Sequence, residues 1–239
     1  MKEIAALRPV GFTPLGPSSG TSVFETGAPP PPCGRNRDGF EVYPDTAAGA
    51  LRYQGWTSAL ARLREHCAVL GGDGVIGVRL SQQKLGRLVE FTASGTAVRA
   101  DGEMHPALPF TAHVGDGEFA ALMSAGWVPV GVVVGPATVR GHLSRRRPQG
   151  DEQPEHTETL THAMVTARRA LHDDALRQSA EEVVVDDMST WVGNEECGSG
   201  EHGTDVEARV LIAGTAIARF RLASRPPLTI MPLHEGGSG

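Results

Sequence analysis

The chain has 239 residues, 40% hydrophobic and 21% charged, a balance typical of globular proteins rather than of disordered ones. Its formal charge of −6 argues against a dedicated nucleic-acid binder, which needs a basic face, and against electrostatic docking on anionic lipid. The chain has no apolar run of the ~20 residues that cross a bilayer, and its start lacks a signal-peptide pattern. We therefore expect a cytoplasmic protein with the length of two ordinary domains and no membrane or nucleic-acid partner.

The elements expected in the first half follow in chain order: a short helical turn at 3–7, a strand at 12–23, a proline-rich loop at 27–39, a helix at 57–70, and strands at 75–80 and 88–100. Thr57 or Ser58 can cap the helix, and the glycine pair at 71–72 ends it. Leucine and cysteine side chains at three- and four-residue spacing form the apolar stripe of this helix.

The second half repeats the same order: a short helix at 118–124, a strand at 128–139, a polar loop at 145–155, a helix at 157–179, and strands at 182–188 and 206–222. The last strand of each half alternates small apolar residues on one face, which indicates a sheet packed on a helix. Each half is therefore predicted to be a β-α-β-β, two-layer α+β unit with a mainly antiparallel sheet. The link between the halves is expected at 101–109.

An internal sequence repeat supports this division. Residues 3–16 read EIAALRPVGFTPLG, and residues 118–131 read EFAALMSAGWVPVG. A second pair, SGTAV at 94–98 and AGTAI at 213–217, occurs in the same order and at nearly the same spacing. The sequence therefore predicts a tandem duplication, with copies at 1–104 and 105–239.

Two glycine motifs resemble catalytic or nucleotide-binding signatures without their structural context. The segment GPSSG at 16–20 matches a nucleophile elbow, but strand-like residues and then the proline-rich loop follow it instead of a helix. The segment GDGVIG at 72–77 matches a dinucleotide fingerprint, but it follows a helix and opens a strand. We predict neither a serine hydrolase nor nucleotide binding, and we interpret the second motif as helix termination.

The densest group of possible metal ligands lies at 195–205. A metal site there would use Glu196, Cys197, Glu201, His202 and Asp205. Thiolate, imidazole and carboxylate groups could together hold zinc or a softer ion, so a divalent or soft metal is the cofactor that the sequence suggests. The alternative is a polar, glycine-rich hairpin loop between two strands.

The three cysteines do not form a disulfide framework. Cys33, Cys67 and Cys197 are odd in number and far apart in the chain. Because Cys67 lies on the apolar stripe of the first long helix, we interpret it as a small buried hydrophobe rather than as a ligand.

Residues 60–98 resemble the YbjQ-like family of heavy-metal-binding domains. The resemblance rests on LARLREHCAVLGGDGVIGVRL at 60–80, followed by VEF at 89–91 and GTAV at 95–98. The second half keeps the helix and GTAI but lacks the GVR element. This resemblance implies a dodecin-like β-α-β-β fold and assembly into rings, typically pentamers. It supplies no set of ligands or catalytic residues.

Two functions follow as hypotheses. The first is a non-enzymatic, ring-forming homo-oligomeric scaffold or binding protein, with an unidentified protein as a further partner. The family resemblance implies a pentamer. The second is a heavy-metal-binding module that uses the loop with Cys197 and His202. No residue cluster predicts catalysis, and an enzyme whose site forms only between subunits stays open as an alternative.

Overall fold

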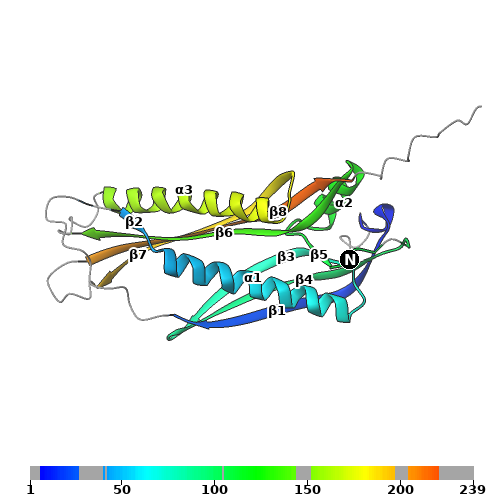
Figure 1. The fold of residues 1–239 in the computed structure, drawn as a ribbon, viewed down its shortest axis with the longest axis horizontal. Helices are drawn as coiled ribbons and strands as arrows, with labels where there is room; N and C mark the ends of the chain where they lie inside the picture. The colour runs from blue at the N-terminus through cyan, green and yellow to red at the C-terminus, as the bar shows by residue number, and fades with distance from the viewer. Residues whose placement is uncertain are drawn as a thin grey trace, which may run out of the picture.

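The computed structural model describes residues 6–26, 40, 42–103, 105–143, 152–196 and 204–220. Its elements in chain order are a 3-10 turn η2 (Arg8–Val10), β1 (Phe12–Glu25), β2 (Val42–Pro44), α1 (Thr46–Val69), β3 (Gly74–Leu85), β4 (Leu88–Ala100), β5 (Phe110–Thr111), α2 (Asp116–Ser124), β6 (Trp127–Leu143), α3 (Pro154–Arg177), β7 (Glu182–Glu196) and β8 (Thr204–Arg219). The fold is α+β with mainly antiparallel sheets, as expected (Figure 1). None of the helices within these ranges has the length and apolar character that crossing a bilayer requires.

The strands form two four-stranded sheets with related orders. The first sheet has the order β1-β4-β3-β5, and the second has the order β2-β6-β8-β7. In the first sheet β4 lies between β1 and β3, and in the second sheet β8 lies between β6 and β7. Each of these central strands pairs antiparallel with both neighbours. Each sheet also takes one short strand from the other half of the chain, because β2 pairs with β6 and β5 pairs with β3.

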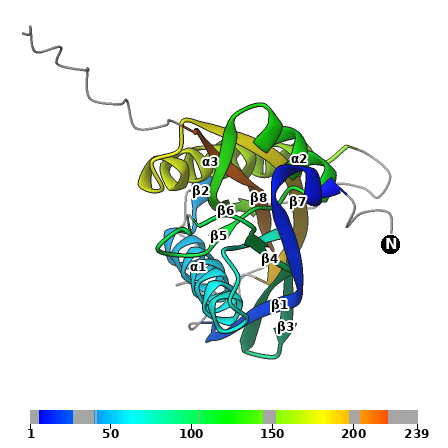
Figure 2. The same ribbon diagram turned by 90° about the vertical axis from the view of Figure 1, so that its right-hand side faces the viewer.

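The elements stack in layers, with α1 in contact with both sheets. Figure 1 shows α3 on the outer face of the second sheet and α1 between the second sheet and the first, and Figure 2 shows the same arrangement from the end. Leu63 of α1 and Phe91 of β4 share one apolar core with Val132, Val134 and Ala213 of the second sheet. A separate core joins α3 to the other face of the second sheet.

Helix α1 begins about three turns earlier than the sequence predicts. Its N-cap is Asp45, whose carboxylate accepts a hydrogen bond from the Ala48 N–H at 3.0 Å, so the prediction of a cap at Thr57 or Ser58 was wrong. The additional turns carry Trp56, which packs edge-on against the Phe91 ring with centroids 5.1 Å apart. Glycines in this stretch resemble helix breakers in the sequence, but a Cβ at Gly55 would overlap the Phe91 ring.

Strands β7 and β8 form a longer hairpin than the sequence predicts. They pair from Glu182↔Ile217 to Glu196↔Thr204, so β7 continues eight residues past its expected end at 188. The second half of β7 is mostly exposed, so it carries no alternation of buried apolar residues that would reveal a strand.

The GPSSG motif is a packing feature, because it brings β1 against α1. The Ser18 hydroxyl is buried and donates to the Leu63 carbonyl at 3.1 Å. A Cβ at Gly20 would overlap the Ala59 carbonyl oxygen. The second half repeats this approach, since a Cβ at Gly135 would overlap the Ala167 carbonyl oxygen of α3.

We expect Gly135→Ala to lower the free energy of unfolding by about 2 kcal/mol or more, because the added methyl group forces α3 away from β6. Gly117→Ala is the matched control, since a Cβ at that position meets nothing within 4 Å. Equilibrium denaturation by guanidinium chloride measures both variants, and equal stability of the two would contradict this packing.

Candidate functional site

The structure describes two of the five proposed metal ligands, and both lie on the hairpin of β7 and β8. Glu196 is the last residue of β7, and Asp205 lies near the start of β8, where it pairs in register with Glu195. Cys197, Glu201 and His202 lie outside the described residues. Within the described ranges, no three His, Cys, Asp or Glu side chains are grouped so that they could hold a metal ion.

Cys67 is buried in α1, as interpreted from the sequence. Its thiol donates to the Gly74 carbonyl with Sγ 3.2 Å from the oxygen. Burial, and then the charge of Asp73, raises the pKa of Cys67 to about 11. The thiolate that a metal or an alkylating reagent needs is therefore scarce at neutral pH.

We expect Cys67 to resist iodoacetamide in the folded protein at about pH 8, since this pKa reduces the thiolate fraction by about a hundredfold. Peptide mass spectrometry measures labelling at this one position. The protein unfolded in guanidinium chloride is the control and should label readily. Equal labelling of Cys67 in the folded and unfolded protein would show that this thiol is accessible.

A buried row of charges crosses the second sheet near the start of α1. Arg140 lies with its Nε 3.0 Å from Asp45 Oδ2 and with a terminal nitrogen 2.5 Å from Glu207 Oε2. Glu207 also pairs with Arg209 of the same strand. The Arg209 guanidinium stacks on the ring of Trp191, 4.3 Å from its centroid. This network fixes the position of Arg209 at the surface of the sheet.

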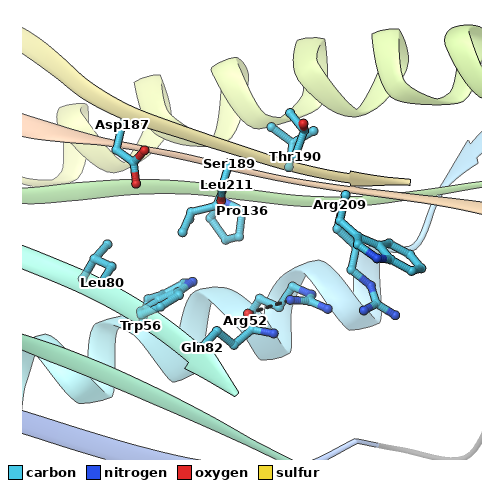
Figure 3. A pocket seen from close by; sticks show the side chains of 12 residues that line it. Arg52, Trp56, Leu80, Gln82, Pro136, Asp187, Ser189, Thr190, Arg209 and Leu211 are labelled. Carbon is cyan, nitrogen blue, oxygen red and sulfur yellow. Dashed lines mark hydrogen bonds between the residues drawn. The ribbon is translucent and has the colours of Figure 1, made fainter. Parts of the chain in front are cut away.

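Arg209 lines a cleft of about 360 Å³ between the two halves of the chain. Helix α1 and β3 form one wall, and β6, β7 and β8 form the other (Figure 3). The side chains that give the cleft its polar and aromatic character are Arg52, Trp56, Gln82, Asp187, Trp191 and Arg209. Sequence reasoning missed this cleft because its two walls come from separate stretches of the chain, 52–82 and 136–211.

Arg52 is a half-buried cation in this cleft. It donates to Gln82 Oε1 at 2.7 Å. Burial, and then the like charge of Arg209, lowers the pKa of Arg52 to about 10. Within the part of the chain that the structure describes, no carboxylate forms an ion pair with Arg52.

A second buried ionisable pair lies where the link between the halves meets β7 and β8. His113 is buried, and its backbone N–H donates to the Thr215 hydroxyl at 2.9 Å. Its Nδ1 lies 3.8 Å from Asp186 Oδ2. Burial lowers the pKa of His113 and raises that of Asp186, so both shifts favour the neutral forms. The link is held to the second sheet here by the hydrogen bond from the His113 backbone to Thr215.

The outer edge of β1 is covered by side chains of α1. The Ser19 N–H donates to His66 Nδ1 at 3.1 Å, and Arg62 donates to the Thr21 carbonyl. These backbone groups point away from β4, so another strand could otherwise pair with them. Helix α1 thereby closes this edge of the first sheet.

The outer edge of β6 is covered in a similar way. The Val132 N–H donates to Thr111 Oγ1 at 2.9 Å, and the Val132 carbonyl accepts from Gln178 at 3.1 Å. The Val134 N–H donates to Asp174 Oδ2 at 2.9 Å. Further along, β2 pairs with β6, so this edge of the second sheet is also closed.

The outer edge of β7 differs from those of β1 and β6, because no described element or side chain covers its backbone. Across residues 182–196 the described backbone hydrogen bonds of this strand run to β8 alone. Three large apolar side chains on β7 are exposed to solvent: Val185 by 56%, Met188 by 49% and Trp191 by 44%. A long, apolar and unpaired edge is a template for pairing with another strand.

Comparison with known proteins confirms the family resemblance for part of the chain. Residues 51–101, which contain most of α1 together with β3 and β4, match the family described as "Putative heavy-metal-binding". The chain is also similar to the encapsulin nanocompartment protein Rv1762c of Mycobacterium tuberculosis, with 29% identity over 198 residues. This similarity covers 77% of the present chain and 73% of the relative. No solved structure matches the chain.

Proposed function

We propose that this protein is a non-enzymatic scaffold that assembles with copies of itself along the edge of β7. The observation that carries the proposal is the contrast between the edges. Side chains and β2 cover the backbone groups of β1 and β6, whereas the 15-residue edge of β7 has no such cover among the described residues. Proteins that stay monomeric usually blunt an edge of this kind with a covering element, charge, proline or a bulge. Strand β7 carries Asp186 and Asp187 and a register shift between Val185 and Asp187, and no described element covers it.

A ring is the form of assembly that we propose, with a pentamer as its size. The outer edge of β3 bonds to residues 110–114 over 74–78, and beyond 78 it has no strand partner among the described residues. Pairing of β7 in one chain with β3 in the next would be a head-to-tail contact, and such contacts close into rings when the rotation between chains allows it. The ring assembly implied by the family resemblance agrees with this geometry.

The similarity to an encapsulin nanocompartment protein supports the same class of function. That relative is named for a protein compartment, and the similarity extends over most of both chains. We infer that the present chain contributes to an assembly of many subunits. An unidentified protein partner remains part of this proposal.

We further propose that the chain consists of two related units, 1–104 and 105–239. The strand orders of the two sheets correspond, and so do individual contacts. The Ser19 N–H in β1 donates to His66 of α1, and the Val134 N–H in β6 donates to Asp174 of α3. Both contacts join the edge of the first long strand of a unit to the last turns of its helix.

We expect Met188→Lys to disrupt the assembly, because a lysine on an edge strand opposes pairing with a second strand. Met188 is exposed, so the substitution should leave the folded chain itself intact. Size-exclusion chromatography with light scattering should give an oligomer for the unchanged protein and a single chain for the variant. Val165→Lys on the exposed side of α3 is the matched control. A monomeric unchanged protein, or a Met188→Lys variant of undiminished mass, would contradict the proposal.

The second candidate function is metal binding by the β7–β8 hairpin. Glu196 ends β7 and Asp205 lies near the start of β8, and the sequence between them holds Cys197, Glu201 and His202. These residue types suit zinc or a softer ion. The description of the matched family favours the same chemistry.

Replacing both Cys197 and His202 with alanine should remove bound metal if this hairpin is the site. Elemental analysis of protein purified without chelator measures the metal content per chain. Cys33→Ala is the control, since it removes a thiol elsewhere in the chain. Unchanged metal content in the double variant, or no metal in the unchanged protein supplied with zinc, would exclude the assignment.

A further inference from the structure

The cleft between the two halves has one positively charged end. Figure 3 shows the side chains of Arg52 and Arg209 towards one end of the cleft and Asp187 towards the other. Glu207 and the Trp191 ring hold Arg209 in place. Two guanidinium groups are thus positioned at one end of a cleft whose volume of about 360 Å³ suits a small molecule.

The charge of Arg52 is not balanced by a direct partner among the described residues. Its hydrogen-bond partner, Gln82, is neutral, and the like charge of Arg209 acts on it. Partial burial of a cation beside a second cation is unfavourable unless an anion compensates. Glu207 and Asp45 favour the charge of Arg52 through longer-range electrostatics, and neither forms an ion pair with it. Arg52 therefore has the surroundings of a residue that binds an anion.

Apolar side chains line part of the cleft, next to polar side chains of β3 and β7. Trp56, 2% exposed, lies in one wall, and Leu80 lies on the same side from β3. Pro136 and Leu211 line the opposite wall. Leu80 and Leu211 are only half-buried, so a ligand with an apolar body would remove further apolar surface from water there.

We propose that this cleft binds a small amphipathic anion, in which a phosphate or carboxylate group lies between Arg52 and Arg209 and an apolar body lies against Trp56, Leu80 and Leu211. The planar guanidinium groups suit a phosphate or carboxylate because they can donate two parallel hydrogen bonds to it. The volume of about 360 Å³ limits the ligand to a small molecule. This site adjoins the proposed β7 edge contact, because residues of β7, including Trp191, line the cleft, and it is separate from the Cys197/His202 hairpin.

Phenyl phosphate is a suitable probe, because it combines the charged group with a flat apolar ring. Isothermal titration calorimetry should detect saturable binding of one molecule per chain, and benzyl alcohol, which lacks the charge, should bind at least tenfold more weakly. Arg52→Gln should weaken phenyl phosphate binding at least tenfold, since it removes a charge-assisted pair of hydrogen bonds. Arg169→Gln, an exposed arginine of α3, is the matched control and should bind like the unchanged protein.

A measurement on the unchanged protein complements the variants. Phenylglyoxal modifies arginine side chains, and peptide mass spectrometry reports the extent at each position. Phenyl phosphate should protect Arg52 from this reagent and should leave Arg169 unprotected. Absence of saturable binding, equal affinity of the Arg52→Gln variant and the unchanged protein, or equal modification of Arg52 with and without the probe would overturn the proposal.

Discussion

The contact of α1 with both sheets is the interaction on which the rest of the structure depends. On one side Leu63 and Cys67 pack on the first sheet, and on the other side the same apolar core includes Val132 and Val134 of the second sheet. Because α1 packs on the face of the second sheet that α3 leaves open, β6 and β8 have buried side chains on both faces. The same contact sets β3 beside β7 and leaves the cleft between them.

The layer order explains which sheet edges are covered and which is not. Helix α1 lies close enough to β1 for His66 to bond the strand's edge, and α3 lies close enough to β6 for Asp174 to do the same. Strand β7 lies on the far side of the second sheet, where few residues of α3 reach it. The unpaired edge is therefore a consequence of the layer order, and it makes self-assembly the function that the geometry favours most.

Local sequence patterns predicted the α+β class and the β-α-β-β order, because glycine turns, helix stripes and strand alternation act over a few residues. They failed where packing decided the outcome. The early start of α1 depends on Gly55 lying under Phe91, and the pairing of β2 and β5 with the other half depends on the tertiary arrangement. Of the candidate sites, the sequence indicated the Cys197/His202 hairpin as a local cluster. The pair Arg52 and Arg209 comes together only in the folded chain and had no local signal.

The most direct test of assembly along β7 is hydrogen–deuterium exchange across residues 182–196 at high and low protein concentration. In a single chain, the amides of β7 that point away from β8 lack partners and should exchange quickly. The account predicts that these amides become as protected as those of β8 at concentrations where the protein assembles. Fast exchange of the same amides at every concentration would contradict the proposed edge pairing.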